Sequence, residues 1–373
     1  MRAPGVPGGA RRAARPAEEE RETPMRAVVF ENYEQFPSLR DVPKPEPGPG
    51  EVLLRVAGSG ACHSDVSVYR HFREGQPGAQ KPPFVLGHEN SGWVEALGEG
   101  VSERVEVGGA YLVYGPTGCG QCRKCARGQD TYCENAATMP YMAVGLGRDG
   151  GMAEYMTAPA HHLVPLGDAD PVDAAPLSDA GLTPYHAVKE ALPHLEGGGR
   201  HALVIGLGGL GQIGVQILRA LTGATVIATD LKEEARAEAE SHGAITVGAG
   251  ERQVEEIREV TGGRGVDAAF DFVGATPTIT TAAAVMAQGG RLTVVGIAGG
   301  THQFSFFTNP YESYVTNTYW GTVGELWEVV DMYRAGQIRP EVERFSMDEA
   351  LEAYRRLEEG EVFGRAVVVP GGG

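Results

Sequence analysis

The chain has 373 residues, of which 42% are apolar and 22% are charged, and its formal net charge is −17. This length allows two domains with separate cores. The acidic balance argues against a surface for nucleic acid or for an anionic membrane, and no apolar run is long enough to span a bilayer, so we expect neither partner.

Residues 1–24 differ in composition from the rest of the chain. They are rich in Pro, Gly, Ala and Arg, contain the acidic run Glu18–Glu20, and lack the apolar stretch of a secretory signal. We expect a disordered tail, or an upstream start codon with Met25 as the true beginning. We therefore expect a cytoplasmic protein, in which clustered cysteines bind metal more often than they form disulfides.

From Met25 to about residue 165, short apolar runs alternate with glycine-rich turns. The predicted strands are Arg26–Phe30, Glu51–Ala57, Gly92–Leu97, Ala110–Tyr114 and Ala153–Thr157. Many short strands with turns between them favour a small β-barrel or sandwich that carries loops.

After Gly197–Gly199 the pattern changes to alternating strands and helices. The predicted strands are His201–Ile205, Ala224–Thr229, Val266–Val273, Arg291–Ile297 and Ala366–Val369. The predicted helices are Leu210–Leu221, Glu233–His242 and 323–335, and Thr183-Pro184 has the pattern of an N-cap followed by proline at the first helical position. Apolar strands that alternate with helices predict a parallel sheet covered on both faces.

A glycine-rich turn follows the strand His201–Ile205 and opens a helix. The candidate residues of this dinucleotide-binding turn are Gly206, Gly208, Gly209, Leu210 and Gly211. Its glycines allow a tight bend and a close approach of the pyrophosphate, which the helix N-terminus attracts. Asp230 ends the next strand near the spacing expected for an acid on the ribose diol, which favours NAD over NADP. The alternative is a glycine-rich turn in another kind of α/β protein.

Four of the five cysteines lie within fifteen residues. They are Cys119, Cys122, Cys125 and Cys133. Two two-residue spacers let the backbone wrap one ion and leave no open coordination position, which predicts a structural zinc site. The alternatives are a pair of disulfides and an iron–sulfur cluster.

The fifth cysteine, Cys62, is combined with the motif Gly87-His88-Glu89. A catalytic zinc needs three protein ligands and one open position, and the other cysteines are already used. The candidate acids for the third ligand are Glu89, Asp173 and Asp179. We favour Asp179, because Thr183 already fills the helix-cap role that would be its alternative. Glu89 is then an outer or exchangeable ligand.

These motifs together resemble the zinc-dependent medium-chain alcohol dehydrogenases, from about Met25 to the C-terminus. The resemblance rests on Cys62–Asp65, Gly87-His88-Glu89, the four cysteines and the turn Gly206–Gly211. The stretch Leu-Ser-Asp-Ala-Gly-Leu-Thr-Pro-Tyr-His that contains Asp179, and the terminal Gly364-Arg365, look like a bacterial branch of NAD-dependent secondary alcohol dehydrogenases with a Cys, His and Asp site. Aspartate stands here where the Cys₂His example of the family has its second cysteine.

The resemblance implies an α/β fold. A GroES-like β-barrel catalytic domain would comprise residues 25–180, with a structural zinc lobe at about 116–135. A Rossmann-type, doubly wound parallel sheet would comprise residues 181–314, and residues 315–373 would return to the catalytic domain. The resemblance also implies two zinc ions per subunit, NAD, a small alcohol or ketone as substrate, and a homotetramer or homodimer.

The resemblance also implies roles for single residues. Ser64 would begin a proton relay from the substrate oxygen, Asp65 would orient a zinc ligand, and Glu89 would stand beside the metal. The implied cofactor contacts outside the glycine turn are His63, Val273, Gly296 and Arg365. The reaction would be the reversible oxidation of an alcohol to a ketone or aldehyde, with hydride transfer to NAD.

Three aromatic residues, Tyr69, Tyr319 and Trp320, would line the substrate pocket. Aromatic walls favour hydrophobic secondary alcohols, whereas the alternative for these residues is ordinary core packing. Rival functions are a polyol dehydrogenase of the same superfamily, a zinc-free quinone reductase and a non-catalytic NAD-binding protein. The presence of both Cys62 and His88 argues against the zinc-free quinone reductase and against the non-catalytic NAD-binding protein.

Overall fold

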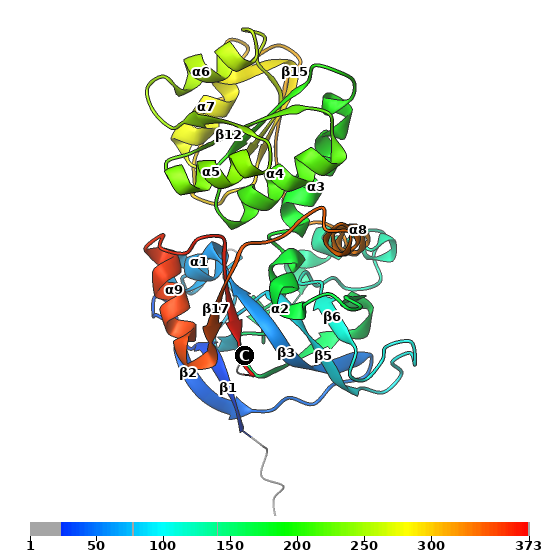
Figure 1. Ribbon diagram of the computed structural model, residues 1–373. Helices are drawn as coiled ribbons and strands as arrows, with labels where there is room; N and C mark the ends of the chain where they lie inside the picture. Colours follow the sequence, from blue (N-terminus) through cyan, green and yellow to red (C-terminus); the bar gives the residue numbers. More distant parts are fainter. Residues whose placement is uncertain (1–23, 77, 140, 372–373) are drawn as a thin grey trace, which may run out of the picture.

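The computed structural model describes residues 24–76, 78–139 and 141–371, which form two domains (Figure 1). The N-terminal and C-terminal parts of the chain share a β-rich domain, and the middle of the chain forms a parallel-sheet domain. The acidic run Glu18–Glu20 and the rest of the expected tail lie outside the described residues, except Pro24, which begins strand β1 (Pro24–Phe30). No helix in the described part of the chain is long and apolar enough to cross a membrane.

The β-rich domain is built on a seven-stranded sheet in the order β10-β6-β5-β3-β18-β17, with β9 paired to β3. Its strands are β3 (Glu51–Ala61), β5 (Glu89–Leu97), β6 (Ala110–Val113), β9 (Tyr155–Pro159), β10 (Leu163–Pro165), β17 (Val342–Ser346) and β18 (Arg365–Val369). Buried side chains such as Leu54, Val94 and Met156 pack together in one core cluster on this sheet.

Two smaller sheets and four helices complete this domain. The strands are β1 (Pro24–Phe30), β2 (Ser38–Pro43), β4 (Phe84–Val85), β7 (Ala143–Val144) and β8 (Gly147–Arg148), and the helices are α1 (His63–His71), α2 (Pro171–Ala174), α8 (Val323–Arg334) and α9 (Ala350–Glu358). The C-terminal strand β18 pairs antiparallel with β3, Ala366 opposite Ala61. The end of the chain therefore stands beside the residues that lead to Cys62.

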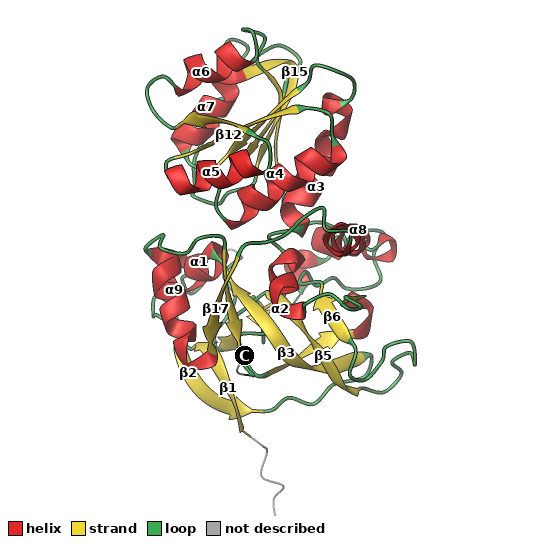
Figure 2. Cartoon of the chain, in the orientation of Figure 1, coloured by secondary structure: helices red, strands yellow, loops and turns green. Residues whose placement is uncertain are grey.

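The parallel-sheet domain contains six strands in the order β13-β12-β11-β14-β15-β16. The strands are β11 (His201–Ile205), β12 (Thr225–Asp230), β13 (Ile245–Gly248), β14 (Val266–Asp271), β15 (Met286–Val294) and β16 (Tyr314–Asn317), and the helices are α3 (Leu182–Leu195), α4 (Gly209–Leu221), α5 (Glu233–Ser241), α6 (Gln253–Val260) and α7 (Thr276–Val285). Every residue of β14 is buried, as expected of a central strand covered on both faces. Helices pack around this sheet (Figure 2). This order confirms the Rossmann-type fold expected from the sequence.

Several boundaries differ from the sequence predictions. Helix α3 begins at Leu182 and not at Pro184, with Gly181 as its N-cap. The strand expected at Arg291–Ile297 runs from Met286 to Val294, because the amides of Val295 and Gly296 both bond to the carbonyl of Asp271 beyond its end. Strand β16 continues the sheet past residue 314, where we expected the domain to end.

Candidate metal and dinucleotide site

The fold brings together four residues that are far apart in sequence, Cys62, His88, Glu89 and Asp179. Their potential ligand atoms all lie within 4.8 Å of one another. Cys62 joins β3 to α1, His88 and Glu89 lie at the start of β5, and Asp179 follows the 3-10 turn η5 (Ala175–Ser178). The Cys62 Sγ is 3.9 Å from Asp179 Oδ2, and the His88 Nε2 is 3.5 Å from that oxygen. One thiol, one imidazole and carboxylates are a donor set that suits zinc.

The fully buried Asp65 orients His88. Its Oδ1 is 3.0 Å from His88 Nδ1, and its Oδ2 accepts hydrogen bonds from Cys62 N at 3.1 Å and from the Tyr354 hydroxyl at 3.2 Å. A proton on Nδ1 leaves the lone pair of Nε2 directed at the cluster, as zinc-binding histidines require. Burial lowers the pKa of His88, but the carboxylates of Asp65 and Asp179 outweigh burial and raise it well above its usual value.

The carboxylate of Asp179 is held by Thr183 on its outer oxygen. The Thr183 hydroxyl donates to Asp179 Oδ1 at 2.7 Å, so the prediction that Thr183 caps the helix is wrong: it lies inside the first turn of α3 and binds the candidate ligand. Although burial raises the pKa of Asp179, its contacts with His88 outweigh burial and lower it. Asp173, the other candidate acid, lies away from the cluster and pairs with Arg344.

Two further residues lie beside the cluster, Ser64 and Arg365. The Ser64 hydroxyl oxygen is 3.1 Å from His88 Nε2. Arg365 forms a buried ion pair with Glu89, and this carboxylate outweighs the effect of burial and raises the pKa of the guanidinium. Burial and the charge of Arg365 both lower the pKa of His63.

Arg365 also touches the glycine-rich turn. A Cβ atom on Gly209 would stand 2.0 Å from Arg365 Cδ, so the arginine packs directly under the N-terminus of α4. The buried Arg365 therefore contacts both Glu89 in the cluster and the candidate cofactor turn. His63 and Arg365, both candidate pyrophosphate contacts, lie near each other at this end of α4.

The glycine-rich turn has the geometry that its motif predicts. Gly206 has a φ of +86°, and a Cβ on Gly211 would lie 1.8 Å from the Gly206 carbonyl oxygen, so neither position tolerates a side chain. Gly208 is the N-cap of α4, and Leu210 lies in the first turn of that helix. No atom lies within 4 Å of the position that a Cβ on Gly208 would take. The backbone is therefore open at the point where a phosphate could approach the helix N-terminus.

Asp230 stands at the end of β12, beside the turn. Its Oδ2 accepts a hydrogen bond from Leu207 N at 2.7 Å, and its Oδ1 accepts one from Lys232 N at 2.9 Å. Val273 lies against the turn, because a Cβ on Gly206 would be 2.6 Å from Val273 Cγ2, and Gly296 packs against the backbone of Val273. These candidate cofactor residues therefore gather at the carboxyl end of the sheet, where doubly wound folds bind ligands.

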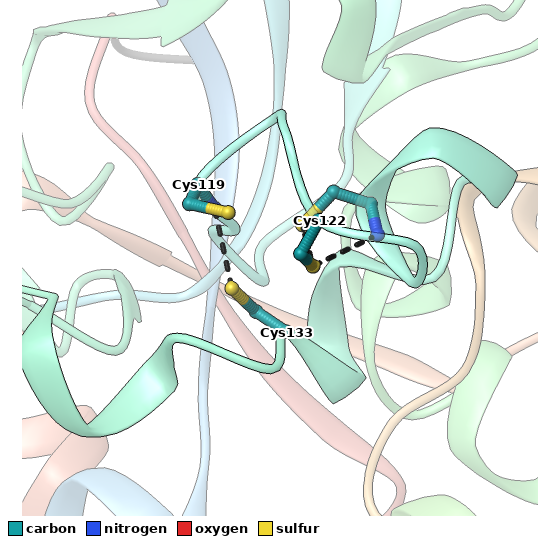
Figure 3. Close-up of side chains that lie close together, drawn as sticks. Cys119, Cys122 and Cys133 are labelled. Atoms are coloured by element: carbon teal, nitrogen blue, oxygen red, sulfur yellow. Dashed lines mark hydrogen bonds between the residues drawn. The ribbon is translucent and has the colours of Figure 1, made fainter.

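The four cysteines of the structural site form a second cluster, on a loop of short 3-10 turns (Figure 3). Backbone amides point at the sulfurs: Cys119 N lies 3.4 Å from Cys133 Sγ, and Cys125 N lies 3.5 Å from Cys122 Sγ. Hydrogen bonds from the backbone of Gln121 and from other groups lower the pKa of Cys119 to about 6. Amide-stabilised thiolates suit a closed tetrahedral zinc site.

The structure separates the three aromatic pocket candidates. Trp320 is 5% exposed, and its ring centroid lies 5.5 Å from that of His88. Burial raises the pKa of Tyr319 to about 12 against the opposing charge of His88, with a smaller raising effect of Asp179, so Tyr319 lies near the metal cluster. The prediction that Tyr69 lines the substrate pocket is wrong. Tyr69 is fully buried between Phe36 and Tyr354, as part of the core under α1, and lines no open site.

Two family descriptions match the chain, the alcohol dehydrogenase GroES-like domain over residues 48–168 and the zinc-binding dehydrogenase over residues 209–333. D-arabinose 1-dehydrogenase (NADP(+)) of Saccharolobus solfataricus is 31% identical, over 92% of this chain and 97% of its own. The alcohol dehydrogenase structure from Aeropyrum pernix is 37% identical, with a TM-score of 0.85, over 92% of this chain and 100% of its own.

A third similar protein is the acetophenone reductase of Geotrichum candidum, solved in complex with NAD. It is 32% identical to this chain, with a TM-score of 0.79, over 93% of this chain and 97% of its own. The matches span both domains, and the two metal clusters and the dinucleotide turn fall inside them. The chain therefore belongs to the zinc-containing medium-chain alcohol dehydrogenase family.

Proposed function

We propose that this protein oxidises a hydrophobic secondary alcohol to a ketone with NAD, and catalyses the reverse reaction. The observation that carries the proposal is the cluster of Cys62, His88, Glu89 and Asp179, in which Glu89 pairs with the arginine that lies under the dinucleotide turn. As a member of its family the chain is an oxidoreductase that uses zinc and NAD or NADP on alcohols or sugars. The choice of alcohol and of cofactor is the proposal.

Cys62, His88 and Asp179 would hold a zinc ion that would supply a Lewis acid to lower the pKa of an alcohol hydroxyl, and the glycine-rich turn would hold a nicotinamide cofactor that would supply the hydride acceptor. The chain's own residues supply orientation and proton transfer. Asp65 fixes the tautomer of His88, and Ser64, whose oxygen is 3.1 Å from His88 Nε2, is a hydroxyl beside the cluster that can accept the proton of the alcohol. Ser64 would thus take the proton released by the alcohol and pass its own hydroxyl proton outward.

We propose Cys62, His88 and Asp179 as the three zinc ligands. Asp179 turns one oxygen to Thr183 and the other toward Cys62 and His88, so a free carboxylate oxygen is available to a metal. The carboxylate of Glu89 is instead engaged by Arg365. The side chain of Asp179 is 14% exposed, whereas that of His88 is 1% exposed, so substrate would approach from the side of Asp179.

For the cofactor we propose NAD rather than NADP. The Asp230 carboxylate is fixed by two backbone amides at the end of β12, where it would accept hydrogen bonds from a ribose diol and repel a 2′-phosphate. The relative that acts on D-arabinose carries NADP in its name, whereas the acetophenone reductase was solved with NAD. The comparison therefore leaves both cofactors within the family, and Asp230 is the reason for choosing NAD.

For the substrate, the two aromatic rings beside the cluster favour an apolar alcohol. Trp320 packs edge-on to His88, and Tyr319 packs edge-on to Trp320 at 5.4 Å between centroids. A sugar or polyol is the alternative, favoured by the D-arabinose relative. Initial rates with 1-phenylethanol, cyclohexanol, D-arabinose and sorbitol, each with NAD and with NADP, distinguish them. Faster oxidation of D-arabinose or sorbitol would overturn the substrate proposal.

We also propose a homodimer or homotetramer that uses the free edge of β16. Among the described strands β16 is the last of its sheet, and large apolar side chains are exposed on it and before it: Phe304, Phe306, Phe307, Tyr311, Tyr314 and Val315. An exposed apolar sheet edge favours pairing with a second copy. Light scattering tests this proposal: a monomeric wild type contradicts it, and so does a variant Tyr314→Lys that assembles as before.

A further inference from the structure

A short segment of the chain carries both aromatic rings that stand beside the metal cluster. This wall segment, residues 319–323, connects β16 to α8. Trp320 has a φ of +52°, a left-handed conformation that a tryptophan adopts only when its surroundings hold it there. Its indole N–H donates to the carbonyl of Ser178 at 3.2 Å, next to Asp179. The surroundings of the wall segment therefore determine where its rings lie.

Part of that support comes from the four-cysteine lobe, residues 116–135. The hydroxyls of Thr131 and Tyr132 each lie 3.4 Å from the carbonyl oxygen of Tyr319. Val323 N donates to the carbonyl of Gly128 at 3.3 Å. The lobe thus contacts the wall segment at both ends, through residues that lie between Cys125 and Cys133.

The phenol of Tyr132 is itself fixed from the far side. Its oxygen is 2.9 Å from His186 Nε2 on α3, and His186 Nδ1 is 3.0 Å from both oxygens of Glu325. Glu325 accepts a hydrogen bond from Thr322 N at 2.8 Å, at the start of α8. The side chains of His186 and Glu325 are 14% and 9% exposed, so the contact between these two residues is largely shielded from water.

We propose that Tyr132 is a positioning residue that connects the four-cysteine lobe to the wall segment and thereby sets discrimination between bulky and small alcohols. The phenol hydrogen-bonds neither Cys62 nor His88. Because the Nδ1 proton of His186 faces Glu325, the phenol donates its one proton to His186 Nε2, and its oxygen is only in contact with the Tyr319 carbonyl at 3.4 Å. Tyr132 therefore acts on the wall segment through His186 and Glu325, which accepts from Thr322 N, and through this contact. The role of the lobe is then to hold the substrate wall as well as a local loop. This inference rests on the proposed alcohol dehydrogenase activity.

The first test compares Tyr132→Phe, which removes only the phenol oxygen, with Tyr141→Phe. Tyr141 lies just beyond the lobe and its ring faces Arg148 instead of the wall segment. For 1-phenylethanol we expect Tyr132→Phe to raise KM by about three- to tenfold, the usual effect of one lost hydrogen bond, with kcat and the KM for NAD unchanged. Propan-2-ol, which is too small to need the wall, should be oxidised as by wild type, and Tyr141→Phe should match wild type with both alcohols.

A second variant acts from α3. His186→Gln removes the ring that spans Tyr132 and Glu325, and should raise the KM for 1-phenylethanol in the same direction. Both variants should retain two zinc ions per chain. Loss of an ion from Tyr132→Phe would overturn the proposal, because the hydroxyl would then support the metal site and not the wall.

The position of Trp320 can also be measured without turnover, by fluorescence quenching. The chain has three tryptophans, so in a Trp93→Phe/Trp327→Phe background the fluorescence reports Trp320 alone. We expect Tyr132→Phe to increase the acrylamide quenching constant of Trp320, which is 5% exposed in the wild type. If wild type oxidises no alcohol but this increase occurs, the proposed function fails and the positioning of Trp320 stands. An active wild type with unchanged KM and unchanged quenching in Tyr132→Phe refutes the positioning role.

Discussion

Replacing Asp65 by Asn tests whether this buried carboxylate orients the metal site. Asp65 accepts hydrogen bonds from three groups, Cys62 N, the Tyr354 hydroxyl and His88 Nδ1. An amide can accept on one side only. If the Asn oxygen faces His88, the NH₂ group faces the two remaining donors. If the amide is turned round, the NH₂ group faces His88 Nδ1 and moves the histidine proton to Nε2, where a metal must bind.

Both orientations have a calculable cost. Two buried donors left without an acceptor destabilise the fold by about 2–6 kcal/mol, at about 1–3 kcal/mol each. Loss of a carboxylate that orients a metal-binding histidine weakens metal affinity by about 10- to 100-fold. Tyr354→Phe is the matched control, because it removes one donor and leaves the contacts of Asp65 with Cys62 and His88 intact.

The assay is chelator competition for zinc, combined with unfolding in urea. We expect Asp65→Asn to lose one of two zinc ions at chelator concentrations that wild type and Tyr354→Phe withstand. Tyr354→Phe should lose only about 1 kcal/mol of unfolding free energy. Wild-type zinc retention in a destabilised Asp65→Asn protein would refute the reasoning, because Asp65 would then support the fold without orienting His88.

Three more substitutions test other parts of the account. Asp179→Ala should abolish turnover and retain the fold by circular dichroism, and normal turnover in a zinc-replete sample would remove Asp179 from the ligand set. Asp230→Gly should raise the NADP-to-NAD ratio of kcat/KM by about tenfold, because like-charge repulsion is removed; an unchanged ratio excludes a ribose contact. Asp267→Asn should destabilise by about 1–3 kcal/mol at pH 7. Although burial raises the pKa of Asp267, its contacts with Arg264, His201 and Arg200 lower it below 3.8, so the carboxylate stabilises the fold above that pH. The difference from wild type should shrink in urea titrations as pH falls below 3.8, and an equal difference at pH 3 would contradict this.

The sequence predicted the metal-binding residues of the site better than the neighbouring residues that hold them in place. Cys62, His88 and the four clustered cysteines were recognisable because metal ligands combine rare residue types with short spacings. Exclusion favoured Asp179 as the third ligand, partly because Thr183 was expected to cap the helix. That cap prediction is wrong, because Thr183 lies inside the first turn and its hydroxyl binds Asp179. Local patterns identify ligands, but they do not say which atom of a neighbour faces them.

The contacts that hold the site could not be predicted from the sequence, because their partners are too far apart along the chain. Tyr132 and His186 are 54 positions apart, and His186 and Glu325 are 139 apart. No periodic pattern or spacer connects them. Tyr69 failed as a pocket residue for a related reason: its aromatic ring is equally suited to a core, and the packing of α1 against α9 decides the matter.

Zinc stoichiometry measured together with turnover tests the central claim most directly. Metal analysis of wild type and of Cys62→Ala, each assayed for NADH formation from 1-phenylethanol, separates the catalytic from the structural ion. We expect two zinc ions and NADH formation in wild type, and one zinc ion and no turnover in a folded Cys62→Ala protein. A wild type with a single zinc ion, or a Cys62→Ala protein that still forms NADH, would contradict this claim.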